Sequence, residues 1–338
     1  MERRYARGDR HREWILTEVV AVDIGGTHAR FAIASVEAGR VRELGAVCTL
    51  KTADYPGLHD AWEAFSASLE RPLPKAAAIA VAGPVQGMAL KLTNSEWVIQ
   101  PTSIRATLGA ERHSLVNDFG AVAHAVAQLA PQHFRHLCGP DRPLPEDGVI
   151  SIVGPGTGLG VAQLLCRDGR YHAIATEGGH LDFAPVDSLD DKILQHLRGK
   201  FKRVSVERIA SGRGLMNIYE ALASLERKEI RFQDEQSLWA AALAQEDDLA
   251  AASLDRFCLT LGSVAGDIAL AQGAQAVVIA GGVGLRLIDH LPNSGFESRF
   301  TAKGRFGSTM TEMPVKIISH AQPGLYGAAA AFAQQFGE

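Results

Sequence analysis

Two glycine-rich segments of the sequence combine residue types that suit phosphate binding. In the first, Asp23-Ile24-Gly25-Gly26-Thr27, a carboxylate stands beside two glycines and a hydroxyl. A phosphate can approach backbone amides only where no side chain blocks it, and glycine leaves that path open. Asp23 could also hold Mg2+, directly or through water. Taken alone, the segment could equally be an ordinary hairpin turn.

The second segment, Gly154 to Gly160, contains Gly156-Thr157-Gly158 and lacks the aspartate. Two loops of this kind are more specific than one. A P-loop would need Gly-x-x-x-x-Gly-Lys-Ser/Thr, and a dinucleotide-binding fold would need Gly-x-Gly-x-x-Gly. Neither pattern occurs at these loops, so the pair favours a nucleotide site outside those two classes.

A third glycine pair, Gly281-Gly282, directly follows the apolar run 277–280. Glycine at the carboxyl end of a strand opens room for a flat ring or a phosphate near the next helix. This signal is weak by itself, because a strand-to-helix turn needs glycine in any case.

Asn117-Asp118 is the candidate for proton transfer. The pair lies where a strand ends and a helix of small residues begins. An aspartate there could accept the proton of a substrate hydroxyl while the neighbouring amide holds an adjacent hydroxyl. The alternative is that Asp118 only caps the helix that starts near Gly120.

Further polar groups suit sugar recognition, because each sugar hydroxyl needs a hydrogen-bonding partner once water is removed. Glu177 and His180 flank two glycines. A metal site is the rival interpretation of this pair, and the absence of a second histidine at ligand spacing disfavours it. Glu207 precedes a glycine break at 211–214, and alone it would pass for a solvated glutamate at a helix start.

The elements that must position these residues repeat along the chain. A strand, turn and strand pattern at Val19 to Val36 returns at Val149 to Leu165, so the two halves resemble degenerate copies of one unit. Elsewhere helices alternate with strands, which predicts α/β layers around a mainly parallel sheet with some antiparallel hairpins. The proline-rich segment Pro131 to Asp147 is the expected boundary between lobes.

Composition sets the broad class of protein. The 338 residues exceed one ordinary domain, and the net charge of -4 gives no electrostatic footprint for nucleic acid. No apolar run approaches the roughly 20 residues of a membrane helix. The four cysteines lie far apart, which indicates reduced thiols in a cytoplasmic protein. Residues 1–17 are rich in arginine, lack an apolar signal-peptide core and are expected to form a flexible extension.

Taken together, these stretches resemble the bacterial glucokinase family of the hexokinase and actin-like superfamily. The resemblance runs in order from Val20 to about Gly327. The motifs that carry it are Asp23-Ile24-Gly25-Gly26-Thr27, Val116-Asn117-Asp118-Phe119, Gly156-Thr157-Gly158-Leu159-Gly160, Glu177-Gly178-Gly179-His180-Leu181-Asp182-Phe183-Ala184-Pro185, and Glu207-Arg208-Ile209 with Ser211-Gly212.

This resemblance implies a role for each candidate residue. Asp118 resembles the general base that takes the proton of the sugar 6-hydroxyl as it attacks the γ-phosphate of ATP. The residues that resemble sugar ligands are Asn117, Glu177, His180, Glu207 and Asn94, the last in a loop with Trp97. The nucleotide side would comprise a first phosphate loop (Asp23, Gly25, Gly26, Thr27, with Mg2+ at Asp23), a second (Gly156, Thr157, Gly158) and an adenosine loop (Gly281, Gly282).

The resemblance also implies an architecture. The expected fold is α/β, two-lobed and actin/hexokinase-like (ribonuclease H-like), with a cleft between a small lobe, 18–129 with 321–338, and a large lobe, 130–320. Closure of the cleft on sugar would exclude water. The implied activity is Mg2+-dependent transfer of the γ-phosphate of ATP to glucose, by a cytoplasmic homodimer without nucleic-acid or membrane partners.

One departure separates the chain from a neighbouring group. The related sugar kinases and repressors carry a cysteine-rich zinc motif after their Glu-x-Gly-His segment, and residues 182–197 contain no cysteine. The DNA-binding members also need a helix-turn-helix domain, for which residues 1–18 are too short. Two alternatives stay open. The substrates could be another hexose, such as mannose or fructose, or another donor, such as ADP or polyphosphate. A sugar-sensing regulator could also keep the fold without catalysis.

Overall fold

The computed structural model describes residues 16–83, 85, 87, 89–92 and 96–337, which form two compact units. Unit 1 contains the described residues up to Val116 and those from Ala328 onward, and unit 2 is Asn117–Gly327. Nearly all of the expected N-terminal extension, 1–17, lies outside the described residues. The expected lobes differ from these units chiefly in helix α3 (Asp118–Gln128), which packs on strands of unit 2.

Unit 1 is built on a mixed sheet with strand order β3-β2-β1-β5-β8, and β4 pairs with β2. β1 and β2 form an antiparallel hairpin that closes at Ile24 and Ala29, and β5 runs parallel to β1. The strands are β1 (Thr17–Ile24), β2 (His28–Glu37), β3 (Arg40–Leu44), β4 (Cys48–Lys51), β5 (Ala76–Val81) and β8 (Arg112–Asn117), with a separate pair, β6 (Leu90–Lys91) and β7 (Val98–Ile99). Every residue of β5 is buried, as expected of a central strand covered on both faces.

Helices close the core of unit 1. These are α1 (Leu58–Ala67), α2 (Ile104–Leu108) and the larger part of α11 (Pro323–Phe336), with short 3-10 turns η1 (Thr52–Asp54) and η2 (Pro101–Ser103). Phe65 of α1 stacks on Phe31 of β2 with ring centroids 5.3 Å apart. The guanidinium of Arg112 lies over the rings of Phe332 and Phe336 in α11, at 5.8 and 5.9 Å. The apolar faces of both helices are thereby held against the sheet residues of this unit.

Unit 2 repeats the plan of unit 1 with strand order β12-β11-β10-β13-β14-β9. β10 and β11 form an antiparallel hairpin, and β13 runs parallel to β10, as β5 does to β1. The strands are β9 (Phe134–Cys138), β10 (Gly148–Pro155), β11 (Leu159–Arg167), β12 (Arg170–Thr176), β13 (Ala276–Ile279) and β14 (Val315–Ile318). The repeated hairpin predicted from the sequence is therefore confirmed. The segment 131–147 was expected to separate the lobes, but it supplies β9, which pairs with β14 inside unit 2.

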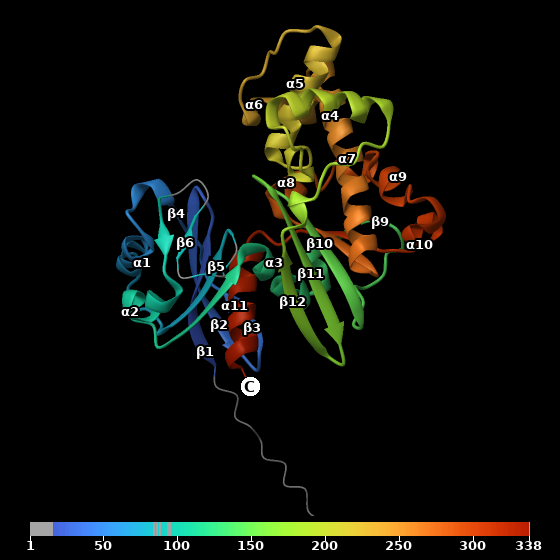
Figure 1. The fold of residues 1–338 in the computed structure, drawn as a ribbon. Coiled ribbons are helices and arrows are strands. Elements are labelled where there is room, and N and C mark those ends of the chain that lie inside the picture. Colours follow the sequence, from blue (N-terminus) through green and yellow to red (C-terminus); the bar gives the residue numbers. More distant parts are fainter. Residues whose placement is uncertain (1–15, 84, 86, 88, 93–95, 338) are drawn as a thin grey trace, which may run out of the picture. The chain divides into compact units, whose positions relative to one another are not determined.

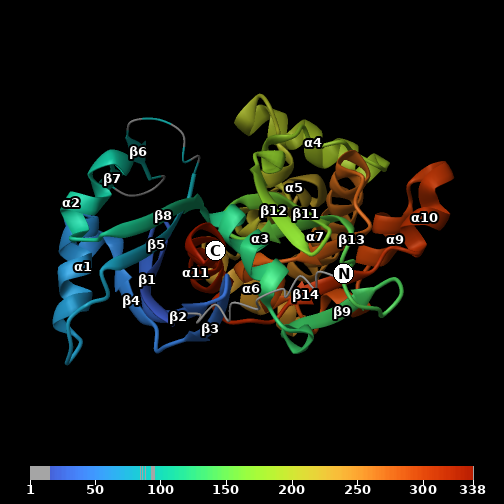
Figure 2. The ribbon, with the colours of Figure 1, turned by 90° about the horizontal axis from the view of Figure 1, so that it is seen from below.

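Helices flank the sheet of unit 2, and α3 lies along β11 and β12 in Figure 1 and Figure 2 alike. The others are α4 (Ser188–Phe201), α5 (Gly212–Glu226), α6 (Glu235–Ala244), α7 (Asp248–Gln272), α8 (Gly281–Arg286), α9 (Phe296–Thr301) and α10 (Gly307–Thr311). The 3-10 turns are η3 (Pro131–His133), η4 (Gly178–His180), η5 (Val206–Arg208), η6 (Leu291–Asn293) and η7 (Gly304–Phe306). Side chains of Asp187, Ser211, Asp234 and Asp247 accept backbone N–H bonds at the starts of α4 to α7, which satisfies donors that the helices cannot pair themselves.

A largely buried ion network fixes α4 against α7 and α9. Arg256 of α7 reaches Asp187 Oδ2 at 2.7 Å and Asp190 Oδ1 at 3.1 Å. Arg299 of α9 also pairs with both carboxylates, at 3.4 Å to Asp190. Burial by itself raises the pKa of Asp187, but the hydrogen bond from Arg256, helped by the N–H of Asp190 and the charges of both arginines, lowers it to about 2. The positive charges of Arg256 and Arg299 balance the negative charges of Asp187 and Asp190, so no side chain of this network carries an unpaired charge.

We predict that Asp187→Asn destabilises the protein in a pH-dependent way. Asparagine keeps the helix cap and removes the charge. Since the folded pKa of about 2 lies below the ordinary value, Asp187 contributes its full stability above about pH 4 and loses it as the pH falls toward 2. The gap in free energy of unfolding between wild type and variant, measured with urea, should narrow from about pH 5 to about pH 3.

Asp247→Asn provides the matched control, because Asp247 caps α7 in the same way but pairs with an exposed arginine, Arg231. Its substitution should cost less, since exposed ion pairs contribute little. A gap for Asp187→Asn that stays constant over this pH range would contradict the role given to its charge.

Candidate active site

Asp118 occupies the first position of α3, directly after β8 ends at Asn117. The Oδ1 of Asn117 accepts hydrogen bonds from the N–H groups of Phe119 and Gly120, at 2.9 and 3.0 Å. Asp118 Oδ1 also accepts a hydrogen bond from Phe119 N–H, at 2.9 Å. The side chains of Asn117 and Asp118 are both partly exposed. The helix cap is therefore Asn117, and the alternative interpretation of Asp118 as the cap is wrong.

The ring of Phe119 ties this helix start to the β10–β11 hairpin. Gly154 and Gly160 face each other across the hairpin. A Cβ built on Gly154 would lie 2.2 Å from the Phe119 ring, and one on Gly160 would lie 1.9 Å from it. These two glycines thus make room for a side chain of the protein itself. The sequence assigns Gly156, Thr157 and Gly158 to phosphate and predicts no role for Gly154, Gly160 or the ring of Phe119.

The turn of this hairpin, at Gly156 and Thr157, is not covered by other protein atoms in the same way. Gly156 N–H donates to Gly158 O at 2.8 Å, and a Cβ on Gly156 would meet no atom closer than 4.0 Å. Thr157 at the tip is exposed. Gly156 O accepts from Gly212 N–H at 2.7 Å, so the start of α5 supports the turn from behind. The predicted second phosphate loop is therefore a supported turn that is open at Gly156 and Thr157.

The first predicted phosphate loop, in unit 1, is likewise the turn of a hairpin. Gly25 N–H donates to His28 O at 2.9 Å, and Thr52 Oγ1 donates to Gly26 O at 3.0 Å. A Cβ on Gly25 would touch nothing closer than 3.6 Å, and Thr27 is exposed. This turn therefore also leaves space at its glycine, where a phosphate could approach the backbone.

Asp23 stands at the end of β1 beside this turn and forms an ion pair with Arg30, Oδ2 to Nη1, at 3.3 Å. Burial raises the pKa of Asp23, and the charge of Arg30 and its hydrogen bond oppose that rise. Within the described residues, no group of three or more His, Cys, Asp or Glu side chains could hold a metal on its own. One carboxylate still fits Mg2+, which commonly takes one or two carboxylates together with waters and substrate phosphates.

Glu177 precedes the short turn η4 and His180 is its last residue, on the surface of unit 2. His180 Nε2 lies 3.9 Å from Glu177 Oε2, and both side chains are exposed. A Cβ on Gly179 would lie 2.0 Å from the carbonyl oxygen of Leu159, so η4 packs directly on the first residue of β11. The two candidate sugar ligands therefore lie at a turn that contacts Leu159, the residue that follows the second phosphate loop.

Glu207 completes this group of residues. The segment before it pairs with the residues after η4, through Val206 N–H to Leu181 O at 2.8 Å and Phe183 N–H to Val204 O at 2.9 Å. The Oε2 of Glu207 accepts from Leu159 N–H at 3.1 Å. Unit 2 thus brings Asp118, the second phosphate loop, Glu177, His180 and Glu207 into one connected arrangement.

Gly281 and Gly282, the expected adenosine loop, serve two different purposes. Gly281 has φ +78°, and a Cβ there would lie 2.5 Å from Pro155 O. It is glycine because α8 begins in contact with β10. Gly282 has nothing within 4 Å of an added Cβ, so this position is open.

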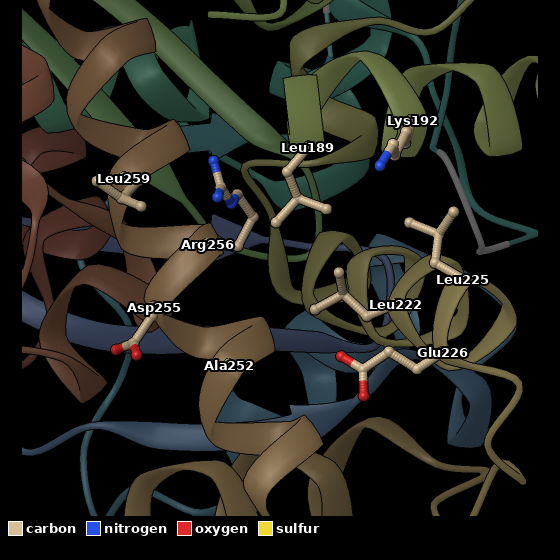
Figure 3. Close-up of a pocket in the computed structure, with 9 residues that line it drawn as sticks. All are labelled: Leu189, Lys192, Leu222, Leu225, Glu226, Ala252, Asp255, Arg256 and Leu259. Carbon is tan, nitrogen blue, oxygen red and sulfur yellow. The ribbon is translucent and has the colours of Figure 1, made fainter. Parts of the chain in front are cut away.

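The remaining expected residues lie apart from this arrangement or outside the described part. Asn94 is outside the described residues. Trp97, expected in the same loop, is buried in the core of unit 1, where its Nε1 donates to Thr52 O at 3.1 Å and Tyr55 O at 2.8 Å. A cavity of about 380 Å3 lies between α4, α5 and α7 (Figure 3). It is lined by Leu189, Lys192, Leu222, Leu225, Glu226, Ala252, Asp255, Arg256 and Leu259, none of which the sequence singled out.

Comparison with known proteins shows the family of the chain. The model of the family described as glucokinase matches residues 20–335. The chain belongs to the glucokinase family. A glucokinase from Zymomonas mobilis is 60% identical over 321 residues, which are 95% of this chain and 99% of that protein.

Solved structures of two proteins described as glucokinases share the fold. The crystal structure of a glucokinase from an Antarctic psychrotroph has a TM-score of 0.81 and 31% identity, and the match covers 93% of this chain and 98% of that one. A ROK family glucokinase from Streptomyces griseus, solved with glucose and AMPPNP, has a TM-score of 0.60 and 21% identity, over 95% and 100% of the two chains. The expected α/β fold of the actin and hexokinase-like class is confirmed.

The Phe119 contact predicts that Gly160→Ala is destabilising. The added methyl would overlap the Phe119 ring, and overpacking of this kind typically costs about 1–3 kcal/mol. Gly156→Ala is the control, because the same methyl would meet open space there. Urea unfolding of both variants should give a clearly lower free energy for Gly160→Ala alone.

A second background tests the cause. In a Phe119→Ala protein the ring is gone, so adding Gly160→Ala should cost much less than it does in wild type. Equal costs in the two backgrounds would show that the ring is not what excludes a side chain at position 160.

Proposed function

We propose that this chain transfers the γ-phosphoryl group of ATP to the 6-hydroxyl of glucose, giving glucose 6-phosphate and ADP, with Asp118 as general base. Family membership makes it an ATP-dependent sugar kinase. The observation that carries the residue assignment is the position of Asp118, held beside the second glycine hairpin by Phe119 and by the Asn117 cap. A carboxylate there can take a proton next to a turn that can hold phosphate.

In the proposed step, Asp118 accepts the proton of the sugar 6-hydroxyl as that oxygen attacks the γ-phosphorus. The new oxygen–phosphorus bond forms as the bond to the bridging oxygen of ADP breaks. The backbone amides of Gly26, Thr27, Thr157 and Gly158 in the two glycine turns would stabilise charge on the phosphates. Mg2+, bound through Asp23 and water, would supply further compensation of that charge.

Sugar recognition is proposed for Asn117, Glu177, His180, Glu207 and Asn94. Hydroxyl-rich ligands need several donors and acceptors, and the described members of this set supply both types around the β10–β11 turn. We propose further that unit 1 presents its turn to Asp118 across a cleft between two lobes, which closes on the sugar and excludes water. Gly281 and Gly282 are assigned to the adenosine moiety.

The setting of the enzyme is part of the proposal. Among the described residues, no helix is both long and apolar enough to cross a lipid bilayer. We assign the protein to the cytoplasm, as a homodimer without a nucleic-acid or membrane partner. Its net charge of -4 is consistent with the lack of nucleic-acid binding.

Substitution of the base is the direct test. Asp118→Asn should lower kcat by about 100- to 10,000-fold, the usual contribution of a general base. Asparagine keeps an oxygen for the Phe119 N–H, and Asn117 still caps the helix, so the fold should persist. Calorimetry should show glucose affinity within a few-fold of wild type. Turnover close to wild type would remove Asp118 from the base role.

Substrate identity is tested by initial rates with purified wild type. Glucose with ATP and Mg2+ should give the highest kcat/KM, and chelation of Mg2+ should abolish turnover. Replacing glucose by mannose or fructose should lower kcat/KM. Replacing ATP by ADP or polyphosphate should lower it as well. A higher kcat/KM for one of these would reassign the acceptor or donor, and glucose binding without ATP consumption would indicate a sugar sensor.

A further inference from the structure

The carboxylate of Glu207 is in direct contact with the second phosphate loop. Its Oε2 accepts from the backbone N–H of Leu159 at 3.1 Å. A Cβ on Gly158 would lie only 2.3 Å from the same oxygen. Glycine at 158 therefore leaves room for Glu207, in the same way that Gly160 leaves room for Phe119. A hydrogen bond to a carboxylate is among the stronger kinds, and this one fixes the end of the turn.

The same carboxylate belongs to the group of residues assigned to sugar. The residues before Glu207 pair with Leu181 and Phe183, which follow His180. Gly179, between Glu177 and His180, packs on the carbonyl oxygen of Leu159, whose N–H Glu207 holds. Both polar groups of the Leu159 backbone thus touch the sugar-binding segments.

We propose that Glu207 is a positioning residue for the second phosphate loop as well as a sugar ligand, so that glucose and nucleotide binding are coupled through its carboxylate. A carboxylate has two acceptor oxygens. Oε2 holds the Leu159 amide, and Oε1 would accept from a sugar hydroxyl. This inference rests on the proposed function, because it takes the turn as the phosphate site and Glu207 as a sugar contact.

Coupling should be positive. A sugar hydroxyl on Oε1 restricts the glutamate side chain, and the restricted side chain holds the Leu159 N–H, hence the turn, in one conformation. Nucleotide that binds after glucose then meets a turn that is already ordered, so it does not have to supply the free energy of ordering it. By thermodynamic linkage, nucleotide must tighten glucose binding by the same factor as glucose tightens nucleotide binding, and such factors are typically about 5- to 150-fold.

Calorimetry with Mg2+ and AMPPNP, with and without glucose, measures this factor on the full chain. In wild type, glucose should lower the Kd of AMPPNP several-fold. Glu207→Ala should raise that Kd about 10-fold even without glucose, and should abolish the effect of glucose on it. Glu177→Ala is the matched control, since Glu177 is a proposed sugar ligand without this bond. It should weaken glucose binding and leave the Kd of AMPPNP measured without sugar unchanged.

Two more variants keep the test valid if Glu207→Ala folds poorly. Glu207→Gln retains an oxygen for Leu159 N–H, so AMPPNP binding without sugar should stay close to wild type while glucose binding weakens. Gly158→Ala alters a residue assigned to phosphate, yet its methyl would displace the Glu207 carboxylate. It should therefore weaken glucose binding measured without any nucleotide.

The outcomes separate this inference from the proposed function. If wild type phosphorylates glucose and needs Asp118, but Glu207→Ala changes only glucose affinity and Gly158→Ala leaves that affinity intact, the coupling through Glu207 is wrong and the kinase assignment stands. If wild type does not phosphorylate glucose, the proposed function fails first.

Discussion

Close approach to the backbone of the β10–β11 hairpin is the constraint on which the candidate site depends. Segments distant in sequence reach this hairpin: Phe119 at Gly154 and Gly160, Glu207 at Gly158, Gly179 at Leu159, and Gly281 at Pro155. Each contact would be blocked by a single Cβ, either on the hairpin or on the approaching residue. The candidate base, the candidate sugar ligands and the candidate adenosine loop therefore share one rigid reference, and such close contact with the hairpin backbone tolerates little change in volume.

Glycine consequently has two meanings in these motifs. At Gly25, Gly156 and Gly282 an added Cβ would meet ordinary contacts or open space, so the protein itself does not demand glycine there. At Gly158, Gly160 and Gly281 the neighbouring protein atoms do demand it. The first group is where a ligand has room to approach the backbone, and the second group builds the frame around it. The sequence alone does not distinguish the two groups, because glycines of both kinds stand next to each other in the same glycine-rich segments.

Much of the fold was predictable because its signals are local. Hairpin turns, buried β-branched strands and capped helices such as α4 and α7 depend on residues within a few positions of one another. The strand β3 was missed because Arg40 to Leu44 is mostly polar and half exposed, so it shows no apolar alternation. Whether Asn117 or Asp118 caps α3 could not be predicted, because both residue types cap helices well and the two are adjacent in the sequence. Only the backbone conformation shows which of them precedes the first helical residue. The role of Phe119 depends on strands more than 30 residues away, although paired glycines outside a turn do signal close approach.

The place of Asp118 in the chain has a mechanical consequence. β8 belongs to the sheet of unit 1, and the next element, α3, packs in unit 2, so the candidate base follows immediately after the chain passes between units. The Asn117 cap and the Phe119 ring, both in unit 2, hold the backbone at this position against the β10–β11 hairpin. A general base must be held within a fraction of an ångström of its target to be effective. Attachment of Asp118, Glu177, His180 and Glu207 to one hairpin of unit 2 therefore preorganises these candidate residues relative to one another.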